Sequence, residues 1–202
     1  MAKQKIGLLL LIITIVVTWW GRYLVFNQEI TQMYTTPREY YEIGDTISYD
    51  DNIINTYTYH GYRIRVDSAE LYRFDDFLNQ FEIEEAETVR PALICLLYVT
   101  IYNDNNVSRA LELDDLTLYG GDHYLYLSDY LETINPQSST AAYFYSHPEI
   151  GQKEMLILPY AAYLEDDSEQ SILKFESQQM YLGLTHFPKE LLVMIQWHRI
   201  EL

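Results

Sequence analysis

The side chains of this sequence that could do chemistry are mostly carboxylates. Adjacent aspartates recur near predicted turns, as Asp50-Asp51, Asp75-Asp76, Asp114-Asp115 and Asp166-Asp167. Calcium takes about six to eight oxygen ligands, which loop carboxylates can provide. The candidate metal ligands are Asp104, Asp114 and Asp115, because one end of a predicted β-sandwich could bring their loops together. Aspartate also caps turns without any metal, and none of the pairs extends into an EF-hand pattern. Turn and solubility roles are therefore the favoured interpretation, and no cofactor is predicted.

The chain carries no recognisable motif for nucleophilic hydrolysis or for nucleotide binding. It has no G-x-S-x-G nucleophile motif, no G-x-x-x-x-G-K phosphate loop and no G-x-G-x-x-G dinucleotide-binding motif. The histidines have no paired zinc-ligand spacing; they are His60, His123, His147, His186 and His198. The one cysteine, Cys95, lies in the apolar run ICLLYVTIYNDNN. A reactive thiol needs an exposed, electropositive setting, so we predict that Cys95 is a buried hydrophobe and that the protein is not an enzyme.

The charge of the chain argues against nucleic acid as a partner. Thirty acidic residues against thirteen basic ones give a formal net charge of −17. Three of the basic residues lie in the first 22 positions, where there is no acid, so the remainder carries a net charge of −20. Such a surface repels phosphate backbones. Cationic ligands, basic peptides and divalent ions remain compatible with it.

The amino terminus predicts a membrane anchor over residues 1–26. Two lysines precede fifteen uncharged residues, Ile6–Trp20. A helix rises ~1.5 Å per residue and a bilayer core is ~30 Å thick, so the span must extend over residues 6–26. The lysines favour a cytoplasmic amino terminus and an extracellular domain. A cleaved signal peptide is the alternative, but Trp19 and Trp20 occupy the place where small residues should precede the cleavage site.

The rest of the chain predicts a stalk over residues 27–42 and a β domain over residues 43–202. A bulge is expected near Asp67-Ser68, and a hairpin around Gly120-Gly121-Asp122. Residues 74–90 predict a short helix or an acidic loop, because their aromatic positions have helical spacing. Short strands without a βαβ rhythm, and twenty tyrosines, favour an all-β antiparallel sandwich.

A family resemblance agrees with this organisation. The run ICLLYVTIYNDNNVSRALELDDLTLYGGDHYLY resembles the central segment of uncharacterised bacterial extracytoplasmic immunoglobulin-like domains, which are telokin-like β-sandwiches. The similar positions are the turn at 103–106, Asp114-Asp115, Leu118, Gly121 and Tyr124. The resemblance covers roughly residues 40–200 and implies an immunoglobulin-like antiparallel β-sandwich preceded by one transmembrane helix. It implies no catalytic residue. Because no cysteine follows the apolar run, it implies a helix anchor instead of a lipid anchor.

Together these observations predict a non-catalytic binding or structural module, tethered to the cell membrane and facing outward. Its ligand is an unknown protein or glycan. The alternative is a calcium-assisted adhesin or glycan-binding module, in which tyrosines such as those of Tyr143-Phe144-Tyr145 stack on sugars. An extracytoplasmic hydrolase that uses acidic residues is a third possibility. An exported domain without an internal disulfide is most typical of Gram-positive bacteria.

Overall fold

The computed structural model describes residues 14, 16–23, 36–49, 53–54, 57–84, 89–106, 109–138, 144–186 and 188–200. The chain divides into two compact units, residues 1–36 and residues 37–202. In the first unit, residues 16–23 are helical and the side chains of Trp19, Trp20 and Tyr23 are exposed. In the part of the chain that the structure describes, none of the helices combines the length and the apolar character needed to span a bilayer. Most of the predicted anchor and stalk lies outside the described residues.

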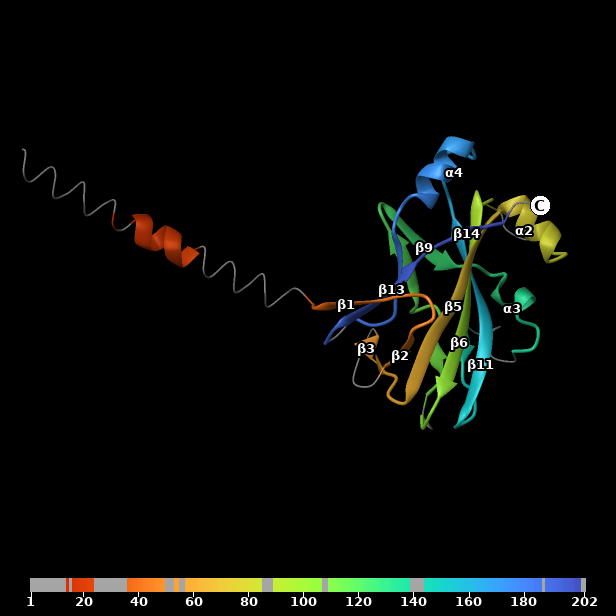
Figure 1. The fold of residues 1–202 in the computed structure, drawn as a ribbon, viewed down its shortest axis with the longest axis horizontal. Helices are drawn as coiled ribbons and strands as arrows, with labels where there is room; N and C mark the ends of the chain where they lie inside the picture. The colour runs from red at the N-terminus through yellow and green to blue at the C-terminus, as the bar shows by residue number, and fades with distance from the viewer. Residues whose placement is uncertain are drawn as a thin grey trace, which may run out of the picture. The chain divides into compact units, whose positions relative to one another are not determined.

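The second unit is mostly β structure with few helices (Figure 1). Its strands are β1 (Arg38–Tyr41), β2 (Thr46–Ser48), β3 (Ile53–Ile54), β4 (Tyr57–Thr58), β5 (Tyr62–Arg73), β6 (Leu93–Asn103), β7 (Leu111–Glu112), β8 (Thr117–Gly120), β9 (His123–Leu127), β10 (Tyr145–Ser146), β11 (Gln152–Ala162), β12 (Met180–Gly183), β13 (Glu190–Ile195) and β14 (His198–Arg199). Its helices are α2 (Phe74–Gln80), α3 (Leu131–Ile134) and α4 (Glu169–Glu176). Strand β1 thus begins inside the segment predicted as a stalk.

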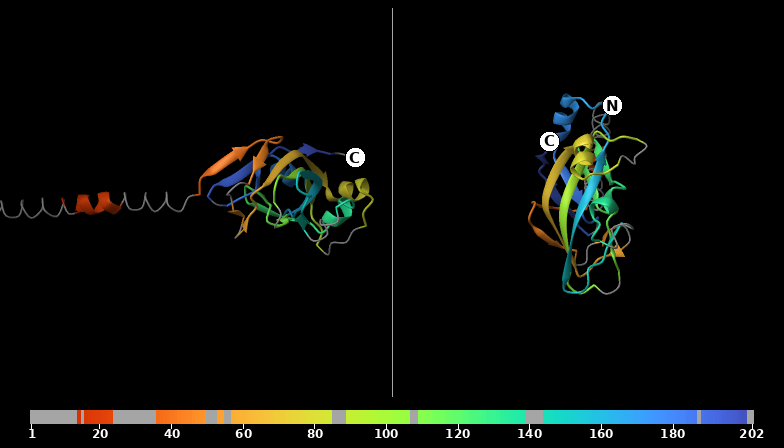
Figure 2. Two further views of the ribbon diagram at one scale, coloured as in Figure 1. Left: turned by 90° about the horizontal axis from the view of Figure 1, so that it is seen from below. Right: turned by 90° about the vertical axis from the view of Figure 1, so that its right-hand side faces the viewer.

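Ten strands form one curled sheet. Its order is β1-β13-β12-β8-β9-β11-β6-β5-β14, and β2 pairs with β5. The long strands β5, β6 and β11 run side by side in the right-hand view of Figure 2. Strand β9 joins the two halves, because Leu125 pairs with β8 and Leu127 pairs with β11. The expectation of a purely antiparallel sheet is wrong at both ends, where β1 runs parallel to β13 and β14 runs parallel to β5.

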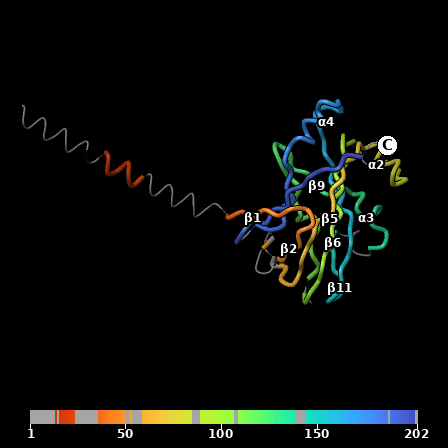
Figure 3. Tube along the Cα trace, in the orientation of Figure 1, coloured from red at the N-terminus to blue at the C-terminus, as the bar shows by residue number. Residues whose placement is uncertain are grey.

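Strand β6 is apolar on both faces, as predicted, and it divides two hydrophobic clusters. The main core holds Leu93, Cys95, Leu97, Val99 and Ile101, the residues predicted to share one face. The opposite face packs into a second cluster that includes Ile94, Leu96, Phe77, Tyr130 and Ile134. Helices α2 and α3 supply part of that cluster, so helices rather than a second sheet cover this face. In Figure 3 the trace can be followed from β5 directly into α2.

Three local predictions are confirmed. The register of β5 against β6 shifts between Val66 and Ser68, which places the bulge where alternation breaks. Strands β8 and β9 form the predicted hairpin, and Gly121 adopts a φ of 55° that glycine tolerates without strain. The helical spacing in residues 74–90 is realised as α2, with Phe74 and Phe77 buried.

Cys95 should not react with thiol reagents in the native protein. Its side chain is fully buried in the main core, and burial raises the pKa of the thiol far above its usual value. The thiolate, which is the reactive species, is therefore scarce at neutral pH and inaccessible as well. We expect a disulfide reagent to label the chain only after denaturant is added. Stoichiometric labelling of the folded chain would contradict this burial.

Candidate functional site

A group of carboxylates is built on one short segment after β6. Leu111, Leu113 and Leu116 point into the main core. Alternation along the segment therefore directs Glu112 and Asp114 to the other side. The amide of Leu116 donates to the carbonyl of Leu113 at 3.1 Å, which closes a turn around Asp114 and Asp115. As a result, carboxylate oxygens of Glu112, Asp114 and Asp115 lie within 4.8 Å of one another. We call these three residues the carboxylate cluster.

The predicted metal ligands are only partly brought together. Asp114 and Asp115 belong to the carboxylate cluster, but Asp104 is engaged by Arg63, whose Nε and Nη2 donate to its two oxygens at 2.6 and 2.7 Å. These hydrogen bonds lower the pKa of Asp104. Glu112 takes the place that the sequence prediction assigned to Asp104. The alternation in LELDD could have identified it, because that pattern puts Glu112 and Asp114 on the same side.

The surroundings of the carboxylate cluster disfavour unbalanced negative charge. Burial, followed by the charges of Glu112 and Asp114, raises the pKa of Asp115. Two basic side chains act on the cluster: Nη2 of Arg109 donates to Oε1 of Glu112 at 3.0 Å, and the charge of His186 lowers the pKa of Asp115 in opposition to the carboxylates.

Two buried phenols lie beside the carboxylate cluster. The side chain of Tyr49 is 1% exposed and that of Tyr59 is 0% exposed, and their rings meet edge to face at 5.9 Å between centroids. A hydrogen bond between the Tyr59 side chain and the Asp115 carboxyl lowers the pKa of that carboxyl. The Tyr49 hydroxyl has no hydrogen-bond partner among the described residues. Burial raises the pKa of Tyr49, and the negative charge of Asp115 adds to this effect.

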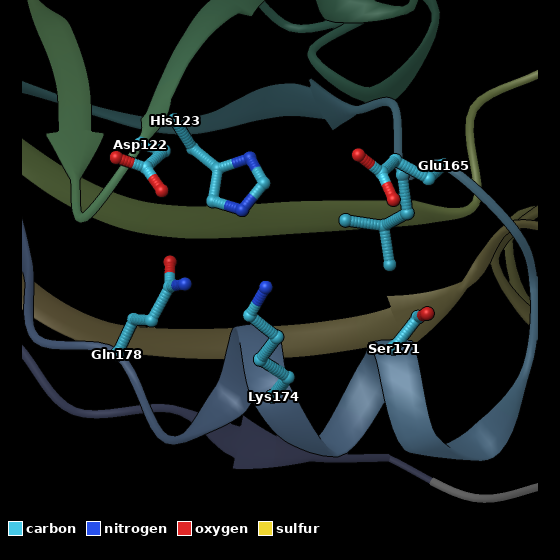
Figure 4. A pocket seen from close by; sticks show the side chains of 7 residues that line it. Asp122, His123, Glu165, Ser171, Lys174 and Gln178 are labelled. Atoms are coloured by element: carbon cyan, nitrogen blue, oxygen red, sulfur yellow. The ribbon is translucent and has the colours of Figure 1, made fainter.

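A small polar pocket lies between the β8–β9 turn and α4, with a volume of about 130 Å³ (Figure 4). Lys174 on α4 lies opposite His123 across the pocket, and Ser171 lies opposite Glu165. The Ser171 hydroxyl donates to Oδ1 of Asp166 at 2.7 Å, and the His123 ring packs against Phe175. The proton of Ser171 is therefore committed to a carboxylate. In its described residues this pocket does not bring serine and histidine into the contact that nucleophilic catalysis requires.

A row of tyrosines crosses the sheet on the face opposite the main core. The rings of successive members lie 5.7, 6.3 and 5.6 Å apart between centroids. The members of this tyrosine row, in order, are Tyr40 on β1, Tyr181 on β12, Tyr119 on β8 and Tyr124 on β9. Tyr124 is 66% exposed, and Tyr126, two residues further along β9, is 76% exposed. The tyrosine row therefore presents a broad aromatic surface to solvent.

The charges beside the tyrosine row are paired. Glu190 accepts hydrogen bonds from the Tyr119 hydroxyl at 2.6 Å and from Nε of Arg38 at 2.7 Å. The charges of Arg38 and Glu190 therefore offset one another beside the tyrosine row.

The aromatic cluster singled out by the sequence lies elsewhere. Tyr143 is outside the described residues, Phe144 packs partly buried against the main core, and Tyr145 is exposed on β10. The signal for the tyrosine row was the alternation in LYGGDHYLY, which predicts the hairpin but not the strand that lies next to it.

Comparison with known proteins gives one match. A family model described as "Domain of unknown function (DUF5028)" matches residues 38–190. The matched segment runs from the first residue of β1 to the first residue of β13, and it contains both the carboxylate cluster and the tyrosine row. No curated protein and no solved structure matches the chain.

Proposed function

The chain belongs to the DUF5028 family of domains of unknown function, and we propose that it is a non-catalytic binding module held outside the cytoplasm by an amino-terminal membrane anchor. In this proposal residues 6–26 enter the membrane and residues 37–202 carry the binding surface. The source is a Gram-positive bacterium, and the curled sheet is a variant of the immunoglobulin-like sandwich. Three features of the sequence support this cellular location: the apolar run of residues 6–20, the lysines that flank it, and the absence of a second cysteine.

The tyrosine row is the observation that supports binding. Large aromatic side chains gathered on one exposed face often mark an interaction site. Tyrosine offers a rigid apolar ring and a hydroxyl, so it gains contact area at a small loss of conformational entropy. Because the neighbouring charges are paired, the ligand that suits this face is an uncharged surface of a protein or a glycan. The acidic remainder of the domain excludes anionic partners from the surrounding surface.

A double substitution on β9 tests this proposal. We expect Tyr124→Ser with Tyr126→Ser to weaken ligand binding at least tenfold, about the effect of losing an aromatic anchor of an interface. Both side chains are exposed, so the fold should remain intact. The matched control is Tyr145→Ser, which removes an exposed tyrosine from the separate β7–β10 ribbon.

The measurement uses the full chain in the cells that produce it. A photoreactive phenylalanine analogue at position 126 should cross-link a defined partner, and the same analogue at position 145 should not. A glycan array probed with the purified chain then separates a glycan ligand from a protein ligand. Equal cross-linking at the two positions would refute the assignment of the binding face. Protection of the domain from protease added to intact cells would refute its orientation.

A calcium-assisted adhesin or glycan-binding module is the second candidate. The observation that favours it is the carboxylate cluster, whose oxygens converge on one point of the β7–β8 connection. Calcium commonly orders loops at the surface of extracellular modules.

A further inference from the structure

The pocket between the β8–β9 turn and α4 is lined by charges of both signs. Asp122 and Glu165 are the acidic groups on its wall, and Lys174 is the basic one. Its volume is about 130 Å³. A cavity of about 150 Å³ holds a benzene molecule, so the pocket fits a ligand with about six non-hydrogen atoms. We propose that this pocket binds a free α-amino acid in its zwitterionic form.

The charged groups of the pocket are available to a ligand. Neither the ammonium of Lys174 nor the carboxylates of Asp122 and Glu165 form a hydrogen bond or an ion pair with another described residue. An anion would be repelled by the carboxylates, and a simple cation would be repelled by the ammonium of Lys174. A ligand that carries one charge of each sign can be oriented so that both charges meet an opposite one.

Asp122 and Gln178 form the end of the pocket that suits the ammonium group of the ligand. The amide oxygen of Gln178 points toward Asp122 (Figure 4). This oxygen is buried and has no hydrogen-bond partner among the described residues. A buried acceptor without a donor is rare. Because the terminal torsion of glutamine is broad, a small rotation lets this oxygen accept from a group in the pocket. An ammonium has several N–H donors, so it can reach both side chains.

Lys174 supplies the complementary charge for the carboxylate of the ligand. Its ammonium points across the pocket toward His123 (Figure 4). The His123 ring is held edge to face against Phe175, at 5.2 Å between centroids, and Phe175 is buried in the main core. A carboxylate placed between Lys174 and His123 would accept a charge-assisted hydrogen bond from the ammonium, which is the stronger kind.

The elements that form the pocket are fixed before a ligand arrives. Gly121 leaves the room that the Gln178 amide occupies, since a Cβ there would lie 2.6 Å from the amide oxygen. The first residue of α4, Glu169, accepts a hydrogen bond from Nη1 of Arg199 on β14 at 2.8 Å. A site built on fixed elements loses little conformational entropy on binding, which favours affinity.

Saturation-transfer NMR of the full chain in detergent micelles tests the site, with racemic alanine as the probe. We expect a dissociation constant of about 1 mM or lower, which lies within the affinity that a ligand of this size can reach. Propionate has the same skeleton without the ammonium group, and ethylamine has it without the carboxylate. Each should bind at least about tenfold more weakly than alanine. No transfer to alanine, or equal affinity for the three compounds, would overturn the proposal.

The decisive variant is Lys174→Met, which removes the charge and keeps a long side chain. Lys174 is exposed, so the fold should remain intact and alanine binding should weaken at least about tenfold. Lys153→Met is the matched control, because Lys153 is an exposed lysine of β11 outside the pocket; its affinity should match that of the wild type. If Lys174→Met does not fold, Asp122→Asn replaces it. Equal binding by the pocket variant and the control would overturn the proposal. None of these changes touches the tyrosine row, so the two proposals fail separately.

Discussion

Replacing Asn135 with alanine should lower the free energy of unfolding by about 3–5 kcal/mol, a large part of the stability of an ordinary domain. Asn135 is fully buried directly after α3. Its Nδ2 donates to the carbonyls of Leu131 and Ile157 at 2.7 and 2.8 Å, and its Oδ1 accepts from the amide of Ile157 at 2.8 Å. Alanine would leave one buried and two partly buried backbone groups without these partners, and each such loss costs about 1–3 kcal/mol.

The position of Asn135 in the sheet explains why it matters. Among the described residues, strand β9 pairs with β11 at Tyr160 and Ala161. Further along β11, the carbonyl of Pro159 accepts a hydrogen bond from the amide of Ser128. Ile157 pairs with Tyr98 of β6 on one side, but on its other side no described strand pairs with it. The side-chain amide of Asn135 offers a donor and an acceptor in the place where the next strand would do so. It therefore completes the ladder of a buried strand.

Urea unfolding of the full chain, followed by circular dichroism, measures this loss. Hydrogen exchange at the Ile157 amide should also become faster, which ties the effect to the ladder. Asn79→Ala on the exposed side of α2 is the control, and its effect should stay within about 0.5 kcal/mol. A loss below about 1 kcal/mol for Asn135→Ala, with unchanged exchange at Ile157, would contradict the role given to this side chain.

Replacing Gly120 with alanine should cost about 3 kcal/mol or more, because the added methyl group meets backbone. A Cβ at Gly120 would lie 2.3 Å from the carbonyl oxygen of Gln179 and 2.9 Å from Cα of Met180. These atoms belong to the start of β12, which pairs with β8. Neither can turn aside as a flexible side chain would, so β8 and β12 must separate locally.

Gly183→Ala is the matched control for this prediction. Gly183 lies on β12 in the same part of the sheet, but a Cβ there would first meet the ring of Tyr119 at 3.1 Å. A ring can shift slightly, and alanine restricts the unfolded chain more than glycine does, so the net change should stay within about 1 kcal/mol. Thermal unfolding of both variants should give a much lower melting temperature for Gly120→Ala. Equal values for the two would refute the close approach.

Local patterns in the sequence were sufficient for several elements. The alternation that breaks at Asp67-Ser68 predicted the bulge, and Gly121 marked the hairpin turn. The spacing of phenylalanines predicted α2, and the apolar run around Cys95 predicted a strand buried on both faces. Each of these features depends on residues within one strand or one turn, where side-chain direction follows from the backbone period.

The candidate sites were predictable only in part. Asp114 and Asp115 were identified as a pair, but Asp104 is held by Arg63, which lies 41 residues away in the sequence. Glu112 was missed because the prediction weighted adjacent aspartates over alternation. Gly120 was read as a turn residue, whereas its small size is required by the backbone of Gln179 and Met180.

The sequence by itself determined the long strands β5 and β6, the β8–β9 hairpin, the burial of Cys95 and the acidic character of the domain. Only the tertiary structure decided which strands distant in the sequence are neighbours. It placed β1 against β13, so that Arg38 pairs with Glu190 from 152 residues away, and it aligned the tyrosines of four strands in one row. Strand pairing across such distances depends on how the whole sheet buries its apolar face, and no local pattern encodes that choice.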